Sequence, residues 1–222
     1  MAKISRTSLE RKRELEEPDK FMVFVARAMQ LAQTYIKQIT AIIGLGVAVA
    51  VVTGGVFYLG ARAEVKASDM LASATARADA AGAESRDEYK AIYETYPRTV
   101  AGQVAGLRYA EQLYRSGEAT AAVDVYKKLV KSVAGKPILH HLALTGLGYA
   151  HEAAGDLKAA ADCFETIATA PVSAHKETAL FNLARLYEQM GETEKSQKAF
   201  AQIVSEYPDS MYVNIAREKS AS

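Results

Sequence analysis

The chain has 222 residues, which is enough for one domain with a hydrophobic core, and a formal net charge of +1. So small a charge supplies no strong positive field, so we expect no nucleic-acid partner. Cys163 is the only cysteine, which excludes a disulfide within the chain.

The first 37 residues are rich in charge, with eight Lys or Arg and five Asp or Glu. Residues 1–20 include the mixed run ERKRELEEPDK and are predicted to form a polar tail in the cytoplasm. Residues 21–37 place apolar side chains at helical spacing, which predicts an amphipathic helix beside the membrane. That helix either extends the span that follows or lies in the interface of the inner leaflet, and the pattern leaves both open.

Residues 38–61 form a run of twenty-four residues without a charge. As a helix the run would reach about 36 Å, more than the roughly 30 Å of a bilayer's hydrocarbon core. We therefore predict a single transmembrane helix. The sequence Ala61-Arg62-Ala63 resembles a signal-peptide cleavage site. A signal peptide, however, has an apolar core of about 7–15 residues, so we expect an uncleaved anchor.

Small residues recur every four positions along this run, at Gly46, Ala50 and Gly54. Membrane helices associate through such stripes, so we predict packing against another span, from a second copy of this chain or from a partner. The basic tail favours a cytoplasmic N-terminus, which would put residues 62–222 outside the cytoplasm.

A pattern recurs three times within residues 62–222. Each unit has a glycine followed directly by an acidic residue, and an aromatic residue later in the unit. Successive aromatic positions are 38 and 36 residues apart. We expect the glycines to form tight turns with positive φ and the aromatic rings to lie buried between helices. The glycines are Gly117, Gly155 and Gly191, and the aromatic residues are Tyr126, Phe164 and Phe200.

These positions resemble the tetratricopeptide repeat, a 34-residue pair of antiparallel helices. The resemblance implies an all-α solenoid of three to four helix pairs after the transmembrane helix. A final helix over residues 209–220 would cap the stack, with Asp209 or Ser210 as its N-cap. The units are expected at about residues 66–97, 103–137, 141–172 and 177–208.

No motif for catalysis is present in the sequence. The patterns G-x-x-x-x-G-K-[ST], G-x-S-x-G, H-E-x-x-H and C-x-x-C are all missing. The one conceivable reactive pair is His151 with Cys163, and we expect a packed thiol at Cys163 and a hydrogen-bonded or exposed imidazole at His151. The sequence therefore predicts no enzyme, no cofactor and no metal site.

The resemblance also implies where a partner would bind. In this family the first helix of each pair lines a concave face that receives other proteins. Apolar or aromatic residues mixed with charges are typical of such a face, although the tyrosines alternatively only pack against neighbouring helices. The predicted groove residues are Leu107, Glu111, Tyr114, Thr145, Tyr149, Glu152, Phe181, Arg185 and Glu188.

The predicted parts of the chain are, in order, a short cytoplasmic tail, one span and a small alanine-rich solenoid. This architecture resembles the YfgM-type ancillary SecYEG translocon subunits of bacterial inner membranes. The resemblance implies a non-catalytic scaffold whose periplasmic domain docks chaperones or secretory machinery. The alternative is a structural accessory subunit of a larger membrane complex, and an enzyme or enzyme accessory is a third possibility.

Overall fold

The computed structural model describes residues 20–81, 85–171 and 174–221. Within these residues the chain forms α-helices and no strand, which confirms the predicted all-α fold. Contacts divide the chain between Leu59 and Gly60 into an N-terminal unit and a C-terminal unit. The predicted polar tail lies outside the described residues, apart from Lys20, where the first described helix begins.

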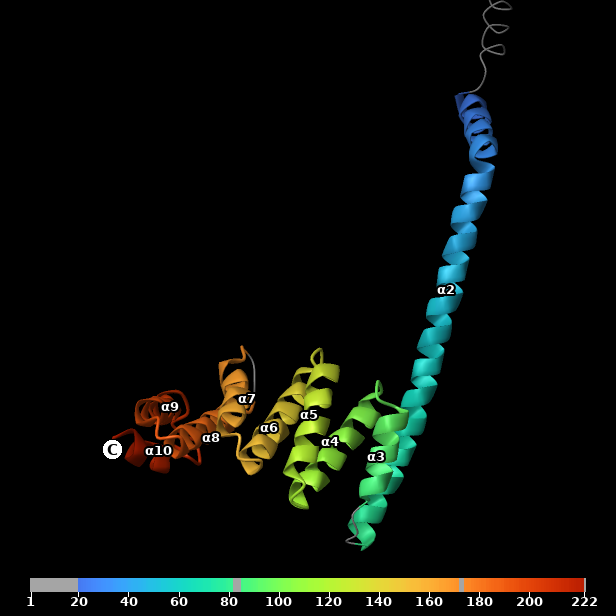
Figure 1. Cartoon of the computed structure of the whole chain (residues 1–222). Coiled ribbons are helices and arrows are strands. Elements are labelled where there is room, and N and C mark those ends of the chain that lie inside the picture. Colours follow the sequence, from blue (N-terminus) through green and yellow to red (C-terminus); the bar gives the residue numbers. More distant parts are fainter. Residues whose placement is uncertain (1–19, 82–84, 172–173, 222) are drawn as a thin grey trace, which may run out of the picture. The chain divides into compact units, whose positions relative to one another are not determined.

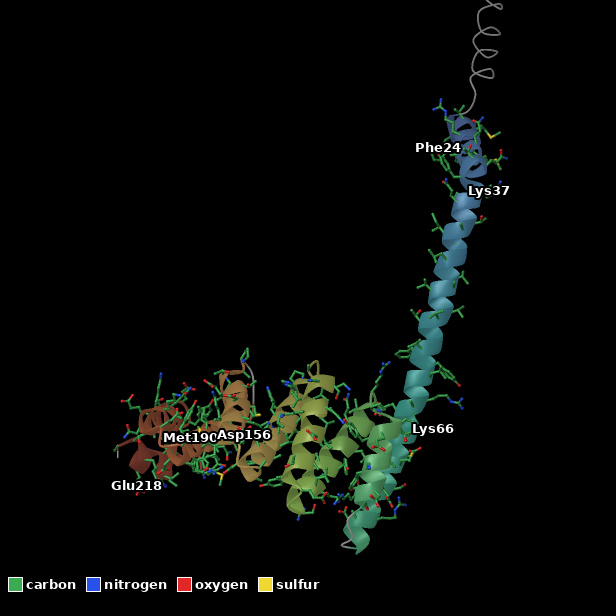
Figure 2. The ribbon with its side chains drawn as sticks, in the orientation of Figure 1. Phe24, Lys37, Lys66, Asp156, Met190 and Glu218 are labelled. Carbon is green, nitrogen blue, oxygen red and sulfur yellow. The ribbon has the colours of Figure 1, made fainter. Side chains whose placement is uncertain are left out.

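The described part of the N-terminal unit is the first part of α2 (Lys20–Ala81), a helix of 62 residues. Most of its large apolar side chains are exposed and project from the helix (Figure 2). Thr53 bonds its hydroxyl to the carbonyl of Val49 at 2.8 Å, so this polar group is satisfied inside the apolar stretch. Among the described residues α2 is the one helix long and apolar enough to be a candidate membrane span.

The C-terminal unit is a stack of helix pairs in which each second helix runs back beside the first (Figure 1). The last part of α2, from Gly60, packs on α3 (Arg86–Thr95) through Ala74, Tyr89 and Ile92. Three further pairs follow, and a final helix, α10 (Val213–Ser220), packs on the last of them. The pairs are α4 (Val100–Arg115) with α5 (Ala119–Ser132), α6 (Pro137–Ala153) with α7 (Leu157–Thr169), and α8 (Lys176–Gln189) with α9 (Thr193–Glu206).

Glycine makes the turns inside these pairs possible. Gly117, Gly155 and Gly191 have φ of 82°, 83° and 75°, a conformation that strains any residue with a side chain. The N–H of the next residue donates to a carbonyl of the preceding helix at 2.8–2.9 Å, which satisfies an otherwise unpaired acceptor at the helix end. The predicted turn glycines are confirmed.

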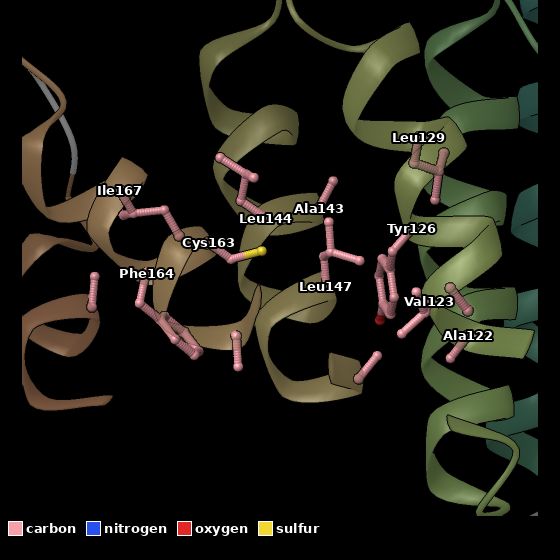
Figure 3. Close-up of a cluster of buried hydrophobic side chains, with 14 of the residues drawn as sticks. Ala122, Val123, Tyr126, Leu129, Ala143, Leu144, Leu147, Cys163, Phe164 and Ile167 are labelled. Atoms are coloured by element: carbon pink, nitrogen blue, oxygen red, sulfur yellow. The ribbon is translucent and has the colours of Figure 1, made fainter. Parts of the chain in front are cut away.

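The aromatic positions form the core between successive pairs. Tyr126, Phe164 and Phe200 are all buried, as predicted from the repeat. Figure 3 shows Tyr126 of α5 on one side of Leu147 of α6, with Phe164 of α7 on the other side. A Cβ built on Gly148 would lie 2.7 Å from Cε2 of Phe164, so the close approach of α6 to α7 depends on that glycine.

The start of α10 differs from the sequence prediction. Tyr212 occupies the N-cap position, so the prediction of Asp209 or Ser210 was wrong. Ser210 instead closes a turn: its N–H donates to the carbonyl of Tyr207 at 3.0 Å, and its hydroxyl accepts from the N–H of Tyr212 at 2.9 Å. Thr99, in the similar Tyr-Pro-x-Thr segment, does cap α4 by accepting from the N–H of Gly102 at 2.9 Å.

Candidate functional site

The predicted groove residues lie on α4, α6 and α8, the first helices of three consecutive pairs. They are called the A-helix row below: Leu107, Glu111 and Tyr114 on α4, Thr145, Tyr149 and Glu152 on α6, and Phe181, Arg185 and Glu188 on α8. Many of them bond to one another or to the next helix of the stack, and the two ends of the row differ in this respect.

A polar network joins the α6 part of the row to the α8 part. Arg185 donates to both carboxylate oxygens of Glu152, at 2.5 and 2.7 Å, which is the strong two-pronged geometry of this ion pair. The hydrogen bond from Arg185 holds the pKa of the Glu152 carboxyl below its ordinary value. The buried Asn182 adds a bond from its amide nitrogen to the hydroxyl of Tyr149, at 3.1 Å. These groups fix the spacing of two neighbouring first helices.

The far end of the row is covered by the chain itself. The ring of Phe181 is stacked on that of Tyr212, and Lys219 of α10 bonds to Glu188 at 2.5 Å. The side chains of Phe181 and Glu188 are therefore engaged by the segment that closes the stack. A partner approaching this end would have to compete with contacts already present.

The α4 end of the row is more open. Tyr114 is 37% exposed, and Glu111 makes one ion pair, with Arg108 one turn earlier on the same helix. Exposed pairs of this kind contribute little to stability, so both charges remain available to a ligand. Leu107 packs partly on the core, and Thr145 on α6 bonds its hydroxyl to the carbonyl of His141 at 2.8 Å.

A hollow that the sequence did not predict lies between residues 64–79 of α2 and α4. Its volume is about 610 Å³, and most of the side chains that line it are small. The alanine-rich composition of residues 61–81 could have indicated this hollow, because short side chains leave open space beside a neighbouring helix. The lining residues are Glu64, Ser68, Leu71, Ala72, Thr75, Ala76, Asp79, Val100, Ala101 and Val104.

Glu64 anchors one side of this hollow. Its two carboxylate oxygens accept from the backbone N–H groups of Val100 and Ala101, at 2.7 and 2.9 Å. These donors belong to the first turn of α4 and have no partner within their own helix. A carboxylate at a helix N-terminus is also favoured by the helix dipole. The segment that follows the apolar run is thus bonded directly to the second helix pair.

His151 and Cys163 are both buried, which confirms the packed thiol and decides against an exposed imidazole. The ring of His151 lies near Asp156, with Nδ1 3.6 Å from Oδ2, and burial lowers its pKa. Burial raises the pKa of the Cys163 thiol to about 11, so the reactive thiolate is scarce at neutral pH. No group of three or more His, Cys, Asp or Glu suited to a metal ion occurs among the described residues.

Comparison with known proteins agrees with this fold. Residues 178–210 match the family described as Tetratricopeptide repeat. The nearly identical TPR-like repeats of a Podosopora anserina protein named as a kinesin light chain have a similar structure, with a TM-score of 0.56 and 13% identity over 70% of this chain and 84% of that one. A point variant of the same repeats gives a TM-score of 0.54 and 14% identity over the same shares.

No curated protein matches the sequence of the chain. At the identities found, the two solved structures show the fold alone. The C-terminal unit is therefore a tetratricopeptide-like solenoid.

Proposed function

We propose that this chain is a non-catalytic, membrane-anchored scaffold for protein–protein interaction. Its partner-binding surface is the α4 end of the A-helix row together with the hollow beside residues 64–79. The observation that carries the proposal is the open side of a tetratricopeptide-like stack, where the exposed Tyr114 and the half-buried Glu111 stand on the helix that lines a hollow of about 610 Å³.

The composition of this surface suggests the chemistry of the partner. Tyrosine and aliphatic side chains provide anchoring contacts, and charges at their margin select orientation. Here the charges of the α4 row and of the hollow are mainly acidic, namely Glu64, Asp79 and Glu111, with Arg108 as a local counter-charge. A partner segment that carries apolar residues flanked by Lys or Arg would complement them.

The proposed setting is a bacterial inner membrane, with the N-terminus in the cytoplasm and residues 62–222 in the periplasm. Support comes from the uncharged run at 38–61 and the basic tail before it. Within this setting the proposed partners are the translocon or a periplasmic chaperone. The stripe at Gly46, Ala50 and Gly54 remains a prediction; a Cβ on either glycine would meet no other atom of the chain within 4 Å, so a second span has room to approach.

The test is co-purification from membranes in mild detergent, followed by mass spectrometry. The surface variant combines Glu111→Lys with Tyr114→Ala, and the control combines Asp124→Lys with Lys128→Ala on exposed positions of α5. We expect the amount of partner recovered with the surface variant to fall severalfold and the amount recovered with the control to stay unchanged. Equal recovery from both variants would contradict the proposal. Recovery of one stoichiometric membrane complex, insensitive to both changes, would favour a structural accessory subunit.

A further inference from the structure

The C-terminal unit exposes large apolar side chains in an uneven way. Among its described residues they occur on α2, α4 and α6 and around α10, and none occurs on α8 or on the second helices α3, α5, α7 and α9. Burial in the stack therefore leaves the second helices covered, while several first helices keep apolar residues in solvent. The exposed residues are Val65, Met70, Val100, Tyr114, Ile138, Leu142, Met211 and Ile215.

Two of these residues occupy the same place in successive repeats. Val100 and Ile138 each stand seventeen residues before a turn glycine, Gly117 and Gly155, and each lies in the first turn of its helix. They are 46% and 74% exposed, and Leu142 follows Ile138 by one helical turn. Because the pairs are antiparallel, the N-terminal ends of α4 and α6 lie on one edge of the stack. This apolar edge comprises Val100, Ile138 and Leu142.

The start of the apolar edge is bonded to Glu64, a residue close in sequence to the uncharged run. Glu64, whose carboxylate bonds to the N–H of Val100 at 2.7 Å, follows Ala61 by three residues. Three residues of helix amount to about 4.5 Å, so the start of α4 is tied to a point less than one turn beyond the run. The exposed Val65 lies beside this contact.

We propose that the apolar edge rests on a lipid surface, with Ile138 and Leu142 inserted at the boundary between headgroups and acyl chains and Val100, which also lines the hollow, at its margin. The inference depends on the membrane anchor of the proposed function, because the anchor is what brings this edge to a bilayer. Isolated aliphatic residues with cationic neighbours suit an interface that is apolar inside and charged outside. Arg98 and Lys136 each stand two residues before an apolar one; Arg98 is exposed, and the ammonium of Lys136 also bonds to Gln103 at 2.7 Å.

The experiment uses the full chain in liposomes of phosphatidylcholine and phosphatidylglycerol, with a fluorophore on a single introduced cysteine. Cys163→Ala removes the native thiol in every sample. The test position is Ile138→Cys, and the control is Lys158→Cys at the exposed start of α7. The 17 residues of α6 separate the two edges by about 25 Å, so only one edge can touch the same lipid surface. Nitroxide-labelled lipids then quench fluorophores at the bilayer surface.

We expect quenching at position 138 to be severalfold stronger than at 158, unchanged when the protein is diluted with lipid, and reduced to the level at 158 by Leu142→Glu. Equal, weak quenching at both positions in protein that resists carbonate extraction would overturn this inference and leave the anchor standing. Cross-linking between copies through position 138 would do the same and identify a second copy as the occupant. Carbonate extraction of the protein would overturn the anchor and this inference together.

Discussion

The ring of Tyr212 lies over that of Phe181, with centroids 4.2 Å apart and planes inclined by 14°. Phe181 also meets Phe200 edge to face, at a centroid distance of 6.2 Å. Tyr212 directly precedes α10, so its contact with Phe181 links the final helix to α8. The helix α10 also packs on α9. The last apolar surface of the solenoid is covered by three aromatic rings in contact.

Removing this ring should loosen α10. We expect Tyr212→Ala to lower the free energy of unfolding of the C-terminal unit by about 1–3 kcal/mol, because both buried area and the ring contact are lost. Met211→Ala is the matched control, since Met211 is 83% exposed, and its effect should stay within about 0.5 kcal/mol. Denaturant unfolding followed by far-UV circular dichroism measures both. Equal stability of the two variants would mean that the stacked rings do not hold α10.

A single methyl group should disturb the contact between α6 and α7. Gly148→Ala would bring a Cβ to 2.7 Å from Phe164, and overpacking of this kind costs about 1–3 kcal/mol. At Gly135 a Cβ meets no atom within 4 Å, so Gly135→Ala serves as the control and should leave the melting temperature nearly unchanged. Thermal unfolding of both variants checks this. A Gly148→Ala protein as stable as the control would show that the pair relaxes without loss.

The sequence allowed prediction of those features that repeat. Glycine turns and buried aromatic residues recur with the unit, so the roles of Gly155 and Phe164 follow from their spacing alone. Contacts that occur once could not be assigned, because they depend on rotamers and on the offset between helices. The pairing of Arg185 with Glu152 and the turn at Ser210 are of this kind. For the candidate site, the sequence indicated which helices carry the row and that a final helix caps the stack. It did not indicate that Tyr212 and Lys219 engage one end of the row or that α2 adds a hollow at the other.

His151 should make stability depend on pH near neutrality. Burial, with a smaller contribution from Lys127, lowers its pKa in the folded chain, while Asp156 acts in the opposite direction. In the unfolded chain the pKa of the His151 side chain is about 6.5. On acidification, the unfolded state therefore binds a proton at a pH where His151 in the folded state is still neutral. The contribution of neutral, buried His151 to the free energy of unfolding is complete above about pH 6.5 and is lost as the pH falls below that value.

We therefore expect His151→Gln to flatten the decline in stability between about pH 7 and pH 5. The pKa of His141 is also lowered, chiefly by burial, so His141→Gln is a comparison that should remove a share of the same slope. Denaturant unfolding at several pH values measures the slopes. An unchanged slope in the His151 variant would show that its protonation is not linked to folding.

Topology can be read with reporters fused after Ser222. If residues 62–222 lie outside the cytoplasm, a phosphatase that folds only there should be active, and a reporter that works only in the cytoplasm should be silent. Fusions placed after Lys37, before the uncharged run, should give the reverse pattern. Cytoplasmic activity at the C-terminus would contradict the proposed periplasmic location.

The bond between Glu64 and the start of α4 sets a limit on how the chain can be shortened. A soluble fragment that begins after residue 64 would leave the N–H groups of Val100 and Ala101 without their protein acceptor and would remove a carboxylate that the helix dipole of α4 favours. A fragment for crystallisation or calorimetry should therefore begin no later than Arg62. The residues that directly follow the uncharged run have the composition of a membrane-helix extension, but their hydrogen bonds make them part of the folded C-terminal unit.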